Sequence, residues 1–350
     1  MAEFLKPAKS NVDLLTEWEN RGLQIPDLVR AERYLDFIGY YRLSAYTIPF
    51  QTTTNSHQFK AGITFDDVLD LYVFDRELRL LIMDAIERIE VAVRSQISNV
   101  MALSLDENGQ KYGAFWYLEG RHFQQKYEHM KLLFSIEKQL LDERIRLDRD
   151  IKNIHKRTKL SDQQKQTLID NAQKENFLRH YLSNYDLPKL PPCWMIMEML
   201  TWGELSHLYA GLKSNAIKNI IARKLGLNAE ILESWLKAFN SIRNFCAHHS
   251  RLWNRELGVK IKIPRTSHIK WLSKPTHSRN KPAHSGKIQF ERRIYSILVA
   301  IQSLLYTISP HSSWAHRLKT LMDKYPKVTK YNMGMPIDWE KDPFWLDALK

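Results

Sequence analysis

The stretch FDDVLDLYVFDRELRLLIMDAIERIEVAVRSQISNVMAL, from Phe65 to Leu103, decides the fold of this 350-residue chain. Its apolar residues recur at spacings of three and four, which is the pattern of one face of an amphipathic α-helix. We therefore expect one long helix here and an all-α protein built around it. The positions that define the apolar face are Leu71, Phe74, Leu78, Leu81, Ile82, Ala85, Ile89, Val93, Ile97 and Val100.

Short helices are expected ahead of the long one. Ser10 can cap a first helix, and Pro26 can occupy the first position of a second helix that runs to Gly39. The aromatic stretch GYYRLSAY then reads as a compact turn region, and residues 47–63 as a loop or minor hairpin. Residues 1–64 would thus form an N-terminal helical region.

The chain after the long helix divides into a charged insertion and a second set of helices. Residues 120–187 are helical in pattern but rich in charge, which favours an insertion that lies over the surface. The Pro-rich stretch PKLPPCW separates it from the second set. One helix is expected through MIMEMLTWGELSHLYAGL, a second near KNIIARKLG and a third from about Asn228. The main helical domain would span residues 65–310, with residues 311–350 as a tail packed on the core.

A formal net charge of +13 is the strongest feature of the composition. Such an excess of Lys and Arg attracts a polyanion, either nucleic acid or an anionic membrane surface. The membrane is the weaker interpretation, because the longest apolar run, Ile294 to Ile308, falls short of the roughly 20 residues that a spanning helix needs. Two cysteines, Cys193 and Cys246, give no disulfide framework. We expect a cytoplasmic protein with no metal site and no cofactor.

The stretch RNFCAHHSRLWNR, Arg243 to Arg255, ends the helix that starts near Asn228 and gathers cations and imidazoles there. Metal-free RNA cleavage needs a base for the ribose 2′-OH, a cation for the phosphoryl oxygens and an acid for the leaving 5′-oxygen. Histidine can take either proton step, and arginine matches phosphate oxygens with its planar fork. Arg243, Asn244 and His248 are therefore candidate catalytic residues. The plainer interpretation is a polar, solvated helix end.

Helical geometry does not bring the two main candidates together. His248 lies about 140° around the axis from Arg243, whereas Asn244 and His248 share a face. The pair can converge where the helix ends or bends, or where a second copy of the protein closes the site. A similar pattern starts at Arg279 in the basic, irregular loop of residues 265–287, and there it indicates chance or an RNA-contacting loop.

Six stretches spread along the chain give it a resemblance to a known family. They are RGLQI at Arg21, GYYRLSAY at Gly39, LYVFDRELRLLI at Leu71, IERIEVAVRSQI at Ile86, WGELSHLY at Trp202 and SWLKAFNSIRNFCAHHSRLWNR at Ser234. The chain resembles the Abi-like (Abi_2) abortive-infection family of bacterial phage-defence proteins, within the HEPN superfamily of RNases. The resemblance covers roughly residues 5–310.

The resemblance implies a HEPN-type helical bundle and a metal-independent endoribonuclease that acts as a toxin. Arg243, Asn244 and His248 take the positions of the family's R-x4-6-H motif, and His249 fits the longer gap as a rival for the histidine role. HEPN sites are completed by pairing two domains, so a chain with one credible motif is expected to form a homodimer.

Further residues are expected to support the site or to hold RNA. Glu90 and Arg94 resemble the acidic–basic pair of the first HEPN helix. Either Glu90 orients Arg243 or Arg94 toward the cleft, or the pair forms an exposed helix ion pair worth about 0.3–0.5 kcal/mol. Arg42, among tyrosines, contacts RNA or anchors the N-terminal helices, and packing favours the anchor. The cations expected to bind the RNA backbone are Arg251 and Arg255, one and two turns beyond the motif, with Arg279, Lys281, Lys287, Arg149, Lys152, Lys156 and Arg157.

Two alternatives use the same charge in other ways. A non-catalytic protein would hold a structured non-coding RNA, with the motif as a binding pocket. A DNA-binding regulator would use the first two helices as a helix-turn-helix, although the second is poor in base-reading polar residues. The expected partners are therefore RNA, as substrate or as a small structured non-coding RNA, and a second copy of the chain. An antitoxin partner stays open.

Overall fold

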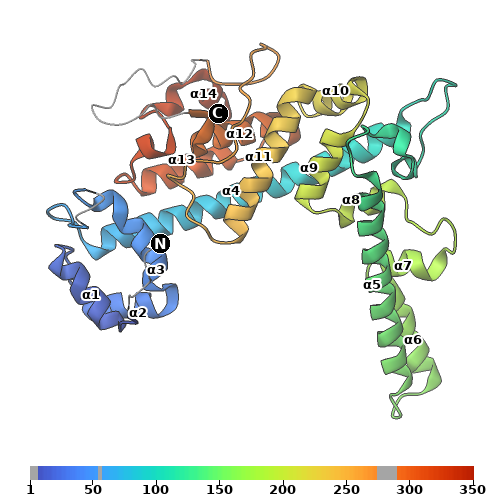
Figure 1. Cartoon of the computed structure of the whole chain (residues 1–350), viewed down its shortest axis with the longest axis horizontal. Helices are drawn as coiled ribbons and strands as arrows, with labels where there is room; N and C mark the ends of the chain where they lie inside the picture. Colours follow the sequence, from blue (N-terminus) through green and yellow to red (C-terminus); the bar gives the residue numbers. More distant parts are fainter. Residues whose placement is uncertain (1–6, 54–56, 274–289) are drawn as a thin grey trace.

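The computed structural model describes residues 7–53, 57–273 and 290–350. Over this part of the chain, α-helices α1 to α14 are joined by loops and short 3-10 turns, and β-pairing occurs as isolated bridges. The expectation of an all-α protein is confirmed. Figure 1 shows that helices from both halves of the sequence gather around one long helix.

This long helix is α4, Phe65–Leu103, whose bounds are those expected from the apolar pattern. Thr64 caps it, because the Thr64 N–H donates to the Asp67 carboxylate at 2.9 Å and the Asp67 N–H donates back to the Thr64 hydroxyl at 3.3 Å. Every expected apolar position except Val100 is buried. At about 1.5 Å per residue, α4 is roughly 58 Å long and runs through the molecule as its axis.

Helices from the second half of the chain pack along α4. Of these, α12 is buried on nearly all sides, including its polar residues Ser296, Gln302 and Ser303, which identifies it as a core helix. Within the described residues, no helix combines the length and the apolar character needed to cross a membrane. They are α8 (Cys193–Met199), α9 (Trp202–Gly211), α10 (Asn215–Lys224), α11 (Ala229–Ala247), α12 (Ile294–Ile308) and α13 (Trp314–Lys324).

The stretch of residues 195–212, expected to form one helix, forms parts of two. The chain leaves α8 at Leu200, and Thr201 caps α9. The Thr201 N–H donates to the Glu204 carboxylate at 2.8 Å, and the Glu204 N–H donates to the Thr201 hydroxyl at 3.3 Å. This capping box satisfies N–H groups that an uninterrupted helix would bond internally. Apolar residues on both sides of the break had masked it.

The N-terminal region contains three helices, not two helices and a turn. Pro26 lies outside the second helix, whose N-cap is Asp27. Gly39 ends that helix with a φ of +87°, a conformation that glycine adopts readily, and the next helix starts at the following residue. The stretch GYYRLSAY is therefore largely helical. The three helices are α1 (Asn11–Asn20), α2 (Leu28–Ile38) and α3 (Tyr40–Thr47).

The charged insertion forms an arm that projects from the body, with α5 and α6 as an antiparallel pair (Figure 1, green). Arg179 ties the arm together: its Nε donates to Glu143 at 2.7 Å and its Nη2 donates to Asp150 at 2.9 Å. The insertion was expected to lie over the surface, but α5 packs mainly on its own neighbours in the arm. The arm consists of α5 (His129–His155), α6 (Asp162–Lys174) and α7 (Phe177–Asn184).

Aromatic side chains attach the last forty residues to the core. The Trp314 indole N–H donates to the Leu81 carbonyl of α4 at 2.9 Å, and the Trp345 indole N–H donates to the Tyr295 hydroxyl of α12 at 2.9 Å. Both tryptophans are fully buried. The helices of this segment are α13 (Trp314–Lys324) and α14 (Pro343–Ala348).

Candidate functional site

The motif that begins at Arg243 lies at the C-terminal end of α11. The side chain of Asn228 caps the helix by accepting the Ile231 N–H at 2.9 Å. Trp235 and Phe239, on the expected apolar stripe, are fully buried, and this face packs against α4 and α9. The predicted start and the predicted buried face of this helix are both confirmed.

The helix ends in a Schellman turn with a histidine in the left-handed position. His249 has a φ of +55°. Its N–H donates to the Cys246 carbonyl at 3.1 Å, and the Ser250 N–H donates to the Phe245 carbonyl at 2.9 Å. A residue other than glycine is uncommon in this conformation. Contacts from elsewhere in the fold are therefore needed to hold it.

One such contact centres on Asp75 of α4, which is completely buried. Its carboxylate accepts the N–H groups of Leu252 and Trp253, at 3.1 and 2.8 Å, just after the Schellman turn. It also accepts the Tyr46 hydroxyl at 2.7 Å and Nη1 of Arg79 at 2.5 Å. Burial raises the pKa of this carboxyl, and the Arg79 guanidinium and the three other donors act against that rise. Asp75 is not among the site residues expected from the sequence.

A second set of contacts comes from α3. Nη1 of Arg42 donates to the His249 carbonyl at 2.7 Å, and Nη1 of Arg251 donates to the Ala45 carbonyl at 2.6 Å. Arg79 adds a hydrogen bond to the Ser250 carbonyl at 3.3 Å. The main chain on the C-terminal side of the motif is thus fixed by three guanidinium groups. Arg42 thus joins α3 to the segment after α11 through a hydrogen bond.

Arg251 and Arg255 do not continue the motif along a helix, because the chain leaves α11 at His248. Besides its bond to α3, Arg251 uses its carbonyl to accept Nε of Arg255 at 3.0 Å. The Arg255 guanidinium lies over the Phe245 ring, 4.4 Å from its centre. Both side chains are half-buried and make contacts within the protein.

The side chains of the motif itself face solvent. Arg243, Asn244, His248 and His249 are exposed. None of these four side chains forms a hydrogen bond or an ion pair with another described residue. His248 is the C-cap of α11, with φ −89° and ψ 11°. Counted at about 100° per residue along the helix, it is offset by about 140° from Arg243. One chain therefore presents Asn244 and His248 on one side and Arg243 on another.

Glu90 and Arg94 form their expected ion pair, and the arginine is buried by contacts to other helices. Its guanidinium donates to the carbonyls of Met197 and Leu200, where α8 gives way to α9; the bond to Leu200 is 2.6 Å long. No described contact joins the pair to Arg243. The geometry gives the pair a structural role in joining α4 to α8.

The remaining cations expected to hold RNA are not gathered at the motif. Arg149, Lys152, Lys156 and Arg157 are exposed near the tip of the arm, and Figure 1 places that tip far from the end of α11. Arg279, Lys281 and Lys287 lie outside the described residues. A single chain thus offers separate cationic regions.

Two further features bear on the chemistry of the motif. Burial raises the pKa of Cys246 to about 12, so this thiol stays protonated and turned into the core. Across the parts of the chain that the structure describes, His, Cys, Asp and Glu side chains do not gather in groups of three or more that could hold a metal ion. The groups that the motif presents to solvent are a guanidinium, an amide and imidazoles.

A family model described as Abi-like protein matches residues 33–254, which is more than half of the chain. The chain belongs to the Abi-like family. Membership in the Abi-like family indicates a role in abortive infection, a defence against phage. No curated protein and no solved structure matches the chain.

The region shared with the Abi-like family contains every element that holds the motif. It starts within α2 and ends one residue before Arg255, so α3, α4 and α11 lie inside it, together with Arg42, Asp75 and Arg79. Helices α12 to α14 lie outside it and supply part of the core. The contacts described around the motif therefore belong to the family region of this Abi-like protein.

Proposed function

We propose that this Abi-like protein is a metal-independent endoribonuclease of the HEPN type that acts as a cytoplasmic toxin in abortive infection. The observation that supports it most is the contrast at the end of α11. The main chain there is held by Asp75, Arg42 and Arg79, while the side chains of Arg243, Asn244 and His248 are exposed and form no hydrogen bond or ion pair with another described residue. Polar groups that add nothing to the fold, on a rigid support, suit a site for a ligand.

The proposed reaction uses few groups. His248 takes the proton from a ribose 2′-OH or gives one to the leaving 5′-oxygen. Arg243 stabilises the charge that develops on the phosphoryl oxygens, and Asn244, on the same side of the helix as His248, helps to place the phosphate. The bond from phosphorus to the 5′-oxygen breaks as the bond from phosphorus to the 2′-oxygen forms. The products are a 2′,3′-cyclic phosphate and a 5′-hydroxyl.

Incubation of the purified protein with structured RNA in excess chelator tests this proposal. We expect cleavage to continue in the chelator, with new 5′ ends that accept a phosphate from a kinase without prior phosphatase treatment and 3′ ends that carry the cyclic phosphate. Products with 5′-phosphates, or cleavage that stops in chelator, would contradict the mechanism. Tight RNA binding without any product would favour the non-catalytic alternative.

That alternative, a protein that holds a small structured non-coding RNA, rests on the net charge of +13 and on the exposed cations of the arm. Lys and Arg contacts to phosphates are largely blind to sequence and weaken as salt rises. Binding and cleavage are compatible, because a bound RNA could restrain a nuclease until infection, as could an antitoxin. The products of the chelator experiment decide between a binder and an enzyme.

The proposed site is shared between two copies of the chain. Arg243 of α11 and His248, the residue that caps its end, are about 140° apart by helical geometry, so the motif of a second copy would complete the face that one copy leaves incomplete. A C2 dimer brings the same patch of both subunits together. In such a dimer the two ends of α11 meet around one phosphate.

A crosslinking experiment tests the shared site. Ala247 is exposed between the motif residues, and Ala247→Cys is expected to give a covalent dimer with a short bis-maleimide. The native Cys193 and Cys246 are buried, so they are not expected to react with the maleimide. Lys237→Cys, exposed on the same helix about 15 Å earlier, is the matched control and is expected to give no covalent dimer. Efficient crosslinking of the control, with none at position 247, would place any dimer contact elsewhere.

A further inference from the structure

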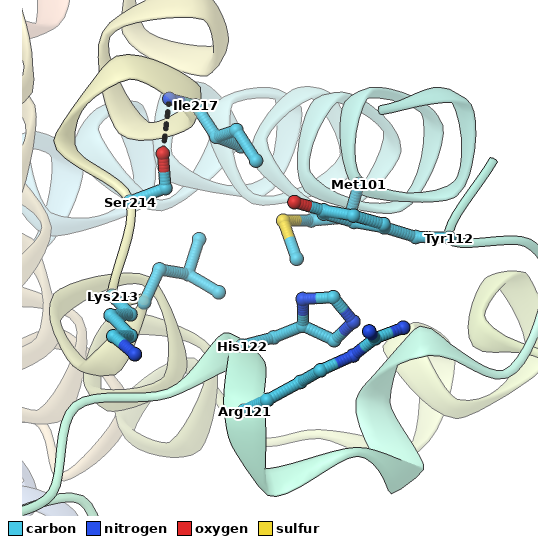
Figure 2. Close-up of a pocket in the computed structure, with 8 residues that line it drawn as sticks. Met101, Tyr112, Arg121, His122, Lys213, Ser214 and Ile217 are labelled. Carbon is cyan, nitrogen blue, oxygen red and sulfur yellow. Dashed lines mark hydrogen bonds between the residues drawn. The ribbon is translucent and has the colours of Figure 1, made fainter. Parts of the chain in front are cut away.

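A cavity of about 340 Å³ lies near the other end of α4, away from the motif. Its apolar side is formed by Met101 of α4 and by Leu212 and Ile217 on either side of the start of α10. Figure 2 shows the His122 ring between Met101 and Arg121, with Lys213 on the opposite side from Tyr112. Apolar surface with a few converging polar groups is the usual composition of a small-molecule site.

The position of the imidazole is the most informative feature of this cavity. The side chain of His122 is 6% exposed, and its Nε2 makes no hydrogen bond with a described residue. The Glu119 carboxylate is 3.7 Å away, too far for a hydrogen bond. Burial lowers the pKa of His122, which favours the neutral ring. A buried nitrogen without a hydrogen-bond partner, on a side chain that lines a cavity, calls for a partner from water or from a bound group.

Main-chain pairing holds the two sides of the cavity in register. Phe123 and Leu212 form an isolated antiparallel bridge, and the Lys213 N–H donates to the His122 carbonyl at 2.9 Å. The Tyr112 ring packs against the imidazole, with 4.1 Å between the ring centres. The two chain segments that carry His122 and Lys213 are therefore joined through their main chains.

Two cationic side chains, Arg121 and Lys213, line the cavity. Arg121 bonds Glu119 through Nε at 2.5 Å, which leaves its terminal nitrogens available, and Lys213 makes no ion pair with a described residue. Ser214 caps the ten-residue helix α10, so the positive end of that helix also lies at the cavity. Helix N-termini and guanidinium groups both favour phosphate.

We propose that this cavity binds a phosphorylated small molecule of mononucleotide size. Its phosphate would lie between Lys213, Arg121 and the start of α10, its ring beside Tyr112, and a hydrogen bond would satisfy Nε2 of His122. The volume is at the lower end of the ~300–1,000 Å³ usual for ligand pockets, which suits a monomer better than a polymer. Met101 is about 39 Å along α4 from Asp75. The site is thus separate from the motif within one chain and independent of the proposed cleavage.

Calorimetric titration of the full chain with the four nucleoside monophosphates tests the proposal. We expect at least one to bind the wild type more tightly than inorganic phosphate or its own nucleoside. Lys213→Ala and Arg121→Ala are each expected to raise the Kd about tenfold or more, because each removes a charge-assisted contact. Lys224→Ala, which removes the same charge at the other end of α10, is the control and is expected to leave the Kd unchanged.

Variants of His122 distinguish the contribution of the imidazole to binding from that of the positive charge around it. His122→Gln keeps a side chain that can donate a hydrogen bond and is expected to weaken nucleotide binding less than His122→Leu. The proposal is overturned if no monophosphate binds, if inorganic phosphate binds as tightly as every nucleotide, or if Lys224→Ala has the same effect as Lys213→Ala. The proposal is also overturned if the binding of an RNA oligonucleotide depends on Lys213 while the binding of every mononucleotide does not.

Discussion

Replacing His248 by alanine is expected to slow RNA cleavage by about 100- to 10,000-fold, because general acid–base catalysis contributes a factor of that size. Arg243→Ala is expected to slow it by about 100-fold or more, since a preorganised donor to the phosphoryl oxygens is lost. Both side chains are exposed and contribute no hydrogen bond to another described residue. The free energy of unfolding should therefore change by less than about 0.5 kcal/mol. Single-turnover cleavage and urea denaturation measure the two effects on the same preparations.

His249→Gly is the control that decides between the two histidines. His249 holds a φ of +55°, so glycine keeps the Schellman turn and relieves strain while the second imidazole is removed. We expect this variant to cleave RNA at nearly the wild-type rate and to retain the thermal stability of the wild type. If His249→Gly loses activity and His248→Ala does not, the catalytic histidine is His249. If both keep full activity, neither imidazole takes part.

Replacing Asp75 by asparagine is expected to lower the free energy of unfolding by about 3–5 kcal/mol, the usual effect of breaking a buried ion pair from one side. The amide group of asparagine would face the donors of Arg79, Leu252 and Trp253, which now all bond the carboxylate. Arg79 would keep its charge without a carboxylate partner. Urea denaturation, followed by far-UV circular dichroism, measures the loss as a lower midpoint.

Two comparisons show whether the effect comes from the buried network. Asp70→Asn makes the same change at an exposed position of α4 and is expected to shift stability by less than about 0.5 kcal/mol. Tyr46→Phe removes one neutral donor to Asp75 and is expected to cost about 1 kcal/mol. Equal midpoints for Asp75→Asn and Asp70→Asn would show that the buried carboxylate does not stabilise the fold.

The elements that the sequence predicts well are those with a local pattern. The apolar face of α4 specifies both of its ends, and Asn228 marks the start of α11, because each signal lies within a few residues of the structure it predicts. GYYRLSAY was misread as a turn because its leading glycine is a residue frequent in turns. Gly39 instead uses its positive φ to let one helix follow another directly.

The features missed in the sequence depend on distant partners. Asp75 is a polar residue on the apolar face of the predicted helix, so it interrupts the pattern from which the helix is predicted. The N–H groups that its carboxylate accepts are more than 170 residues away in the sequence. The cavity around His122 needs the bridge between Phe123 and Leu212, which no local pattern indicates. The available signal for the buried network was an aspartate within the apolar face of a long helix. Such a residue indicates a buried polar contact, but it does not indicate which groups form it.

The contacts of α3 set a limit on how far this protein can be shortened. Helix α3 holds the end of the motif through two hydrogen bonds. Arg42 donates to the His249 carbonyl, and the Ala45 carbonyl accepts from Arg251. A fragment that begins at α4 would retain all four exposed motif residues and yet lose the clamp on their backbone. The smallest autonomous unit must therefore start upstream of Tyr40, although the groups proposed to meet RNA come two hundred positions later.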